Sequence, residues 1–171
     1  SVISGGASFT HNSTGNSTLA GANSYSGATT INNGTVNLTG NLSGGTAITI
    51  NGGNLTQGSA SVISGAASLT HNSTGTSTLA GVNTYTGNTT VNAGTLALGA
   101  NQTIGAIAGA GNINLSTYNL SANSSSSTTF SGVVSGSGGS LTKAGTGTLT
   151  LSGNNTYTGA TTVNGGTLVI G

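Results

Sequence analysis

Short runs of alternating apolar and polar residues recur along the whole chain, as in Thr148-Leu149-Thr150-Leu151 and Ala47-Ile48-Thr49-Ile50. Alternation with a period of two predicts half-buried β-strands of four or five residues. Gly and Asn separate the runs, for example at Asn33-Gly34, Asn51-Gly52-Gly53 and Asn164-Gly165-Gly166. Both residue types tolerate the backbone conformations of tight corners. The pattern therefore predicts an all-β chain of many short strands.

The pattern returns in three copies. Residues 1–38 align without gaps on residues 61–98, at an offset of 60, and differ at 11 of 38 positions. A third copy runs from about Ser131 to the end, at an offset of 72, and places Lys143 where His11 and His71 stand. We expect the extra residues of this longer offset to form a bulged loop at residues 124–127, four serines with no apolar side chain to face a core. The chain is interpreted as one solenoid of three modules, residues 1–60, 61–130 and 131–171.

Short repeated strands favour a parallel β-helix over a β-sandwich. A sandwich needs longer, hairpin-joined strands and larger core aromatics, whereas this chain has only four Tyr and two Phe. The turn residues suit either fold, but the inward Leu, Ile and Val of the repeats favour the coil. The spacers at residues 40–60 and 99–122 keep the alternation, so we expect further coils there. At roughly 20 to 25 residues per coil, the chain makes about seven or eight coils that bury their apolar faces against one another.

We expect the recurring apolar, aromatic and glycine positions of the modules to be structural. Three tyrosines share one module position, which would also suit a carbohydrate platform, but packing at a corner is the favoured interpretation. The structural positions are Leu19, Leu79, Leu149, Leu151, Tyr25, Tyr85, Tyr157, Gly34, Gly94, Gly166, Val163 and Leu168.

The third copy carries the most specific motif, which runs from Gly139 through Leu149 and Tyr157 to Leu168. It resembles the autotransporter-associated β-strand repeat, also called the passenger-associated transport repeat. The first two copies match this motif less closely and have a histidine in place of the lysine. The resemblance implies a right-handed parallel β-helix in the exported passenger of a bacterial autotransporter. It also implies an extracellular or cell-surface location, where such repeats aid secretion and present other domains.

Charge is almost absent from the chain. Lys143 is the only Lys or Arg, and there is no Asp or Glu. Two-carboxylate glycoside hydrolysis, carboxylate-bound calcium and Ser-His-acid triads are thereby excluded, so we expect neither enzymatic activity nor a cofactor. One cation cannot neutralise the phosphates of a nucleic acid. No segment reaches the ~18 apolar residues of a membrane span, so we expect no membrane insertion by this chain.

His11 and His71 are the most conspicuous candidates for chemistry. About three coils separate them at the ~4.8 Å spacing of rungs, whereas a metal ion needs both ring nitrogens within about 2 Å of itself. They therefore cannot share a metal within one chain. We expect both histidines to face solvent, with contact to a neighbouring chain as the alternative. Lys143 is interpreted as a solvated residue of the repeat.

The lack of charge and of Pro removes most features that keep β-edges from pairing with another chain. Because the sequence begins and ends inside the repeat pattern, we expect either a homopolymer that stacks head to tail or continuation of the solenoid at both ends. The predicted function is a structural solenoid, as a passenger segment or a fibre subunit. The alternative is a binding module. It would be an adhesin for glycans or a host surface, or an ice-binding solenoid lined by Thr-X-Thr pairs such as Thr76/Thr78 and Thr148/Thr150.

Overall fold

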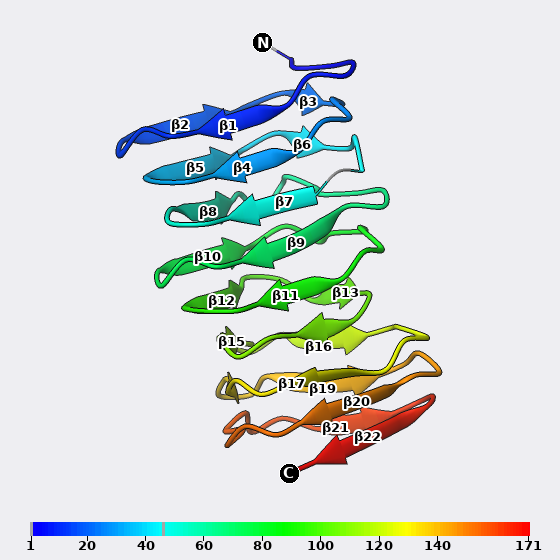
Figure 1. Cartoon of the computed structure of the whole chain (residues 1–171). Helices are drawn as coiled ribbons and strands as arrows, with labels where there is room; N and C mark the ends of the chain where they lie inside the picture. Colours follow the sequence, from blue (N-terminus) through cyan, green and yellow to red (C-terminus); the bar gives the residue numbers. More distant parts are fainter. Residues whose placement is uncertain (1, 46) are drawn as a thin grey trace.

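The chain folds as a stack of parallel β-strands wound into a coil (Figure 1). The computed structural model describes residues 2–45 and 47–171, so Ser1 of the first module lies outside the described residues. Within these ranges there are 22 strands and no helix, and hence no helix that could cross a bilayer. Near strands run leftwards and far strands run back behind them as the chain descends in Figure 1, which makes the coil right-handed. The prediction of a parallel β-helix is confirmed.

Each turn of the coil has three sides, here called faces A, B and C in chain order. Face A consists of a six-stranded sheet and a three-stranded sheet, joined by a bridge between Gly109 and Phe130. Its strands are β1 (Phe9–His11), β4 (Thr29–Ile31), β7 (Ala47–Ile50), β9 (Ser68–His71), β11 (Thr89–Val91), β14 (Ile107–Ala108), β17 (Thr128–Phe130), β20 (Thr148–Leu151) and β22 (Thr167–Ile170). Nine strands in register on one face correspond to about eight turns.

Faces B and C complete each turn. Face B is one seven-stranded sheet of β2 (Asn16–Leu19), β5 (Thr35–Leu38), β8 (Asn54–Gln57), β10 (Thr76–Leu79), β12 (Thr95–Leu98), β15 (Asn112–Asn114) and β18 (Val134–Ser135). Face C holds β3 (Ala22–Asn23), β6 (Asn41–Leu42), β13 (Gln102–Ile104), β16 (Asn119–Ala122), β19 (Ser140–Lys143) and β21 (Thr161–Val163). The partner residues on face A are 18 to 21 positions apart. The turns therefore lie at or slightly below the lower limit of the predicted range.

The core is a continuous column of side chains inside the coil. Strand residues alternate between buried and exposed, as in β9, where Leu69 and His71 point inward and Ser68 and Thr70 point outward. Backbone amides donate to carbonyl oxygens of the adjacent turns, for instance Asn51 N to Ile31 O in the preceding turn at 2.8 Å and Leu69 N to Asn88 O in the following turn at 3.0 Å. Because every turn pairs with its neighbours, burial of apolar side chains and main-chain hydrogen bonding are satisfied together.

The third module sits on different faces from the first two. Strands β1 and β9, which open the first two copies, lie on face A, whereas the corresponding β19 lies on face C. Residues 124–127 form a corner between β16 and β17, and the Ser124 carbonyl accepts a hydrogen bond from Gly147 N at 3.0 Å. The expectation of a bulged loop is therefore wrong. The extra residues before the third copy form part of the paired coil and do not bulge out. They lengthen the path along the coil, so the third copy begins on a different face.

The last turn exposes side chains that are buried elsewhere. Val163 and Ile170 are 51% and 57% exposed, while Val91 and Leu98, at the same positions of the second module, are 0% and 3% exposed. No turn in the structure covers β21 and β22 on their C-terminal side. The last turn of this chain therefore presents an apolar surface made of Val163, Leu168 and Ile170, here called the terminal surface.

Candidate functional site

A basic side chain is buried at one corner of each module. His11, His71 and Lys143 are 5%, 0% and 2% exposed. The expectation that they face solvent is therefore wrong, and burial inside one chain also removes the two histidines as contacts to a neighbouring chain. Since a strand alternates inward and outward residues, their position two after an inward apolar residue places them inside the coil. The low overall charge gave no sign of this burial.

Corner carbonyl groups accept hydrogen bonds from these basic side chains. The Lys143 ammonium donates to the carbonyl oxygens of Gly145 and Gly165. His11 Nε2 lies 3.1 Å from the Gly15 carbonyl oxygen, and its Nδ1 lies 3.1 Å from Ser17 Oγ. Because a carbonyl only accepts, we assign the ring proton to Nε2, and the Ser17 hydroxyl then donates to Nδ1. A basic residue thus fills each corner, and at these two corners its polar atoms are bonded.

His71 is less completely paired than His11. Its Nδ1 donates to the Ala93 carbonyl oxygen at 3.0 Å, while Nε2 has no hydrogen-bond partner among the described residues. Burial lowers the pKa of His71 below its ordinary value, and the bond to Ala93 opposes this only in part. The ring is therefore neutral near pH 7. Among the described residues, no group of three or more potential ligands could hold a metal ion.

One glycine in each module lies directly beneath a corner of the preceding turn. Gly34, Gly94 and Gly166 have φ of +62°, +59° and +63°. A Cβ built on Gly94 would overlap the carbonyl oxygens of Gly75 and Ser73, and the other two glycines face equally close carbonyls. Both the backbone conformation and the lack of space therefore require glycine at this position.

The module tyrosines lie inside the coil and bond to a threonine four residues later. The hydroxyl groups of Tyr25 and Tyr85 lie 2.6 Å and 2.7 Å from Thr29 and Thr89 Oγ1, and both rings are almost fully buried. Tyr157 makes the same 2.7 Å contact to Thr161 but is only half-buried, in the last turn. Burial raises the pKa of Tyr85 to about 12, so its hydroxyl stays protonated. The recurrence of Thr at the fourth position after Tyr was the sequence signal for this pair.

An asparagine two residues before each tyrosine bonds to the preceding turn. The Oδ1 atoms of Asn23, Asn83 and Asn155 accept hydrogen bonds from the backbone amides of Ile3, Ile63 and Val134 at 2.8 to 3.0 Å. These side-chain bonds join neighbouring turns at places where at least one of the two segments lies outside a strand. Their identity at one position in all three modules was a signal that sequence reasoning missed.

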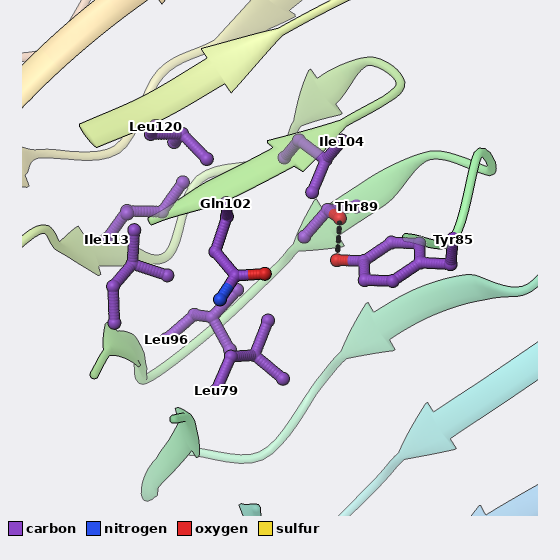
Figure 2. Close-up of a pocket in the computed structure, with 9 residues that line it drawn as sticks. Leu79, Tyr85, Thr89, Leu96, Gln102, Ile104, Ile113 and Leu120 are labelled. Carbon is purple, nitrogen blue, oxygen red and sulfur yellow. Dashed lines mark hydrogen bonds between the residues drawn. The ribbon is translucent and has the colours of Figure 1, made fainter. Parts of the chain in front are cut away.

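Asn83 also belongs to a network of buried amides. It exchanges hydrogen bonds with Gln57 at 2.6 and 2.9 Å and donates to Gln102 Oε1 at 3.1 Å. Figure 2 shows Gln102 directed into the core among Leu79, Leu96 and Ile113, beside the bonded pair of Tyr85 and Thr89. The side chains that line this space leave no room for a water molecule between them. The interior is therefore packed and offers no ligand cavity here.

The outer side of face A carries two columns of identical residues over the first five turns. Strand pairing places Thr10, Thr30, Thr49, Thr70 and Thr90 in register, one per turn. Two positions later stand Asn12, Asn32, Asn51, Asn72 and Asn92, whose side chains form a chain of Nδ2 to Oδ1 hydrogen bonds of 2.7 to 3.1 Å. We call these ten residues the threonine–asparagine array. The predicted Thr-X-Thr pairs are dispersed instead, with Thr76 and Thr78 on face B and Thr148 and Thr150 on face A.

Comparison with known protein families identifies the repeat. The family model described as Passenger-associated-transport-repeat matches residues 9–38, 69–98 and 141–170. Each match covers a strand–corner–strand unit, the third side of the turn and a second strand–corner–strand unit. The chain matches no curated protein and no solved structure. Because the three matches together cover more than half of the chain, the chain belongs to the passenger-associated transport repeat family.

Proposed function

We propose that this chain is a non-enzymatic structural rod of the bacterial cell surface or extracellular space, as a segment of an autotransporter-like passenger. The observation that carries the proposal is the pairing of successive turns from β1 to β22, through the three repeat copies and the spacers between them. At the ~4.8 Å strand spacing, eight turns extend about 38 Å. Such a stack extends along one axis and can hold other domains away from a surface.

The composition supports a structural role over catalysis. The chain contains no Asp or Glu, and its lysine and two histidines are buried and bonded to corner carbonyls. General acid–base catalysis needs a titratable group within reach of a substrate. The residues that would be most suited to chemistry are instead used to close the corners of the coil.

Surface location is testable on intact cells of the source organism. An antibody raised against the purified chain should label intact cells without permeabilisation, or should detect the chain in the culture medium. Labelling that appears only after permeabilisation would contradict the proposed location. A cytoplasmic marker protein, probed in the same cells, serves as the control for intact envelopes.

We further propose that copies of the chain stack head to tail into fibres. The terminal surface presents Val163, Leu168 and Ile170, whose counterparts in the second module are buried. At the opposite end, β1 is the first strand of face A. Its upper edge pairs with no strand of the described chain. Parallel strands from a second copy would bury these apolar side chains and pair the free edges of both ends.

Association through the ends has a matched pair of variants. Ile170→Lys places a charge on the terminal surface, whereas Val82→Lys changes a side chain that is 63% exposed on the side of the coil. Sedimentation velocity should show concentration-dependent assembly for the unmodified chain and Val82→Lys, and its loss for Ile170→Lys. Monomers at every concentration, with no fibres in electron micrographs, would refute the fibre but leave the rod intact.

A carbohydrate-binding role finds less support in the fold. Tyr25 and Tyr85 are 0% and 2% exposed, so their rings do not form an open platform for sugar stacking. Tyr157 alone of the three keeps an exposed edge, in the last turn. Glycan binding that is lost on Tyr157→Ala, but kept in Tyr85→Phe, would favour this second function.

A further inference from the structure

The threonine–asparagine array is regular in two directions. Along the axis, its members repeat once per turn at the ~4.8 Å spacing of adjacent strands. Across the strands, each threonine is two residues from its asparagine, which is about 6.7 Å in extended backbone. The strand pairs of β1, β4, β7, β9 and β11 show no slip in register, and Figure 1 shows these five strands stacked one below another.

Side chains in the array are held in fixed orientations. Each of the four links between neighbouring asparagines is a hydrogen bond between carboxamides, as from Asn51 Nδ2 to Asn32 Oδ1 at 2.8 Å. Threonine is branched at Cβ and so has few χ1 rotamers in a strand. Thr30, Thr49, Thr70 and Thr90 are also half-covered by their neighbours. The array therefore presents methyl, hydroxyl and amide groups at nearly constant positions.

The outer surface of face B lacks this regularity. On face B, the matching outward column reads Thr18, Asn37, Thr56, Thr78, Ala97, Asn114 and Ser135. On face A, the threonine column continues past Ala108 as Thr129 and Thr150. An abundance of threonine alone would not give one identical residue on five consecutive turns of one face and a mixture on the next.

We propose that the threonine–asparagine array binds the surface of ice. Its two spacings are close to the repeat distances of oxygen rows in hexagonal ice, so water bonded to its hydroxyl and amide groups is held near lattice positions. The methyl groups order water around them without competing hydrogen bonds. Lys143, the only Lys or Arg, is buried and on face C, so no Lys or Arg side chain disturbs the water over the array.

Ice is favoured over two other occupants. A crystalline polysaccharide would be expected to stack its sugar rings on aromatic side chains, and the array contains none. A second copy of the array could pack against the first as a dry interface of asparagine ladders. That arrangement would hide the hydroxyl groups without giving them partners, whereas an ice surface satisfies them.

Thermal hysteresis of the purified full chain tests the proposal, together with the shape of single ice crystals grown in its presence. The unmodified chain should show hysteresis and faceted crystals. Thr49→Lys, at the centre of the array, should lose most of the hysteresis. Thr56→Lys makes the same change at an outward position of the same turn on face B, and should keep it. Circular dichroism of both variants confirms that they fold.

Three results would overturn the proposal. The first is an unmodified chain with neither hysteresis nor crystal shaping, and the second is equal loss in both lysine variants. The third is a dimer in sedimentation that Thr49→Lys dissociates while hysteresis is absent, because the array would then be an interface between copies. The proposal is independent of stacking through the ends, since Ile170→Lys should abolish fibres and leave the hysteresis of the single chain unchanged.

Discussion

The first two modules and the third carry the same repeat on different pairs of faces. In the first two, the corner with the buried histidine connects a strand on face A to a strand on face B. In the third, the corner with Lys143 connects β19 on face C to β20 on face A. His71 and Phe130 occupy the same column of face A three turns apart. From Phe130 the chain passes along β18 on face B before it reaches Lys143 on face C.

The comparison shows that the repeat specifies local geometry and not a particular side of the coil. Its constant features are a strand, a corner filled by a basic residue, a second strand and a glycine beneath the corner. Tyr157 keeps its bond to Thr161, and Asn155 keeps its bond to Val134 N, although both now lie on face B. Since each face offers parallel pairing at the same spacing, the unit fits wherever the chain length places it.

Replacing the corner glycine should have the largest effect. Gly94→Ala drives a Cβ into two carbonyl oxygens at a positive φ, so we expect a loss of at least about 1–3 kcal/mol in the free energy of unfolding from the backbone conformation alone. Gly166→Ala creates the same contact in the last turn and should unfold that turn locally, with a smaller change in the main transition. Denaturant titration followed by circular dichroism measures both.

Gly15→Ala is the control for these variants. It lies in the corner directly above Gly34 in the first module, and its added Cβ would meet nothing closer than Ser13 Oγ at 3.6 Å. Its unfolding midpoint should stay near that of the unmodified chain. Equal destabilisation by Gly15→Ala and Gly94→Ala would show that the close packing of the corner is not the cause.

Removing the tyrosine hydroxyl should distinguish the interior from the last turn. Tyr85→Phe leaves Thr89 Oγ1 buried without its partner, and we expect a loss of about 1–3 kcal/mol. Tyr157→Phe removes the same bond where water reaches both groups, so its effect should be much smaller. Unfolding free energies of the two variants give the comparison, which would fail if both changes had the same effect.

Acid should destabilise the chain through His71. Its pKa is lowered in the folded state, so the unfolded chain, with an ordinary value near 6.5, binds a proton more readily. The stability is full above about pH 6.5 and falls as the pH drops below it. There is no Asp or Glu side chain to add its own dependence in this range.

His71→Val places in this position the residue found one turn later at Val91. The variant should lose less stability than the unmodified chain between pH about 7.5 and about 5, as measured by denaturation midpoints. An unchanged pH dependence would show that protonation of His71 does not contribute.

The asparagine ladder should contribute least. Asn51→Ala removes two of its four links, and because these bonds are exposed we expect a loss of at most about 1 kcal/mol. Asn37→Ala, an outward and half-buried asparagine on face B, is the control. A loss for Asn51→Ala no greater than for Asn37→Ala would indicate that the ladder orders side chains without stabilising the fold.

The sequence was sufficient to predict the parallel coil and the family. Alternation in runs such as Thr148-Leu149-Thr150-Leu151 determines which side chains point inward, and the gapless return of the first module in the second requires stacked, similar turns. The glycine positions also follow, because Gly34, Gly94 and Gly166 recur before a strand. The strand alternation and the corner glycines depend on local backbone preferences, which are the same at every position of the chain.

Properties that depend on the turn length could not be predicted in the same way. The column of Thr10, Thr30, Thr49, Thr70 and Thr90 appears only when turns of unequal length are aligned. The same holds for the shift of Lys143 to face C. Burial of His11, His71 and Lys143 was missed for another reason, since ionisable residues are usually exposed and the carbonyl groups that hold them are invisible in sequence.

Disulfide trapping tests the central claim of a continuous coil with a displaced third module, and the chain has no native cysteine to interfere. Ser121 and Thr142 are paired on adjacent strands of face C, a separation that a disulfide can span. The double variant Ser121→Cys/Thr142→Cys should therefore oxidise within the monomer to a closed disulfide. Ala108→Cys/Thr142→Cys, which would pair if the third module had stayed on face A, should remain reduced. Closure of the second pair and not the first would contradict the account.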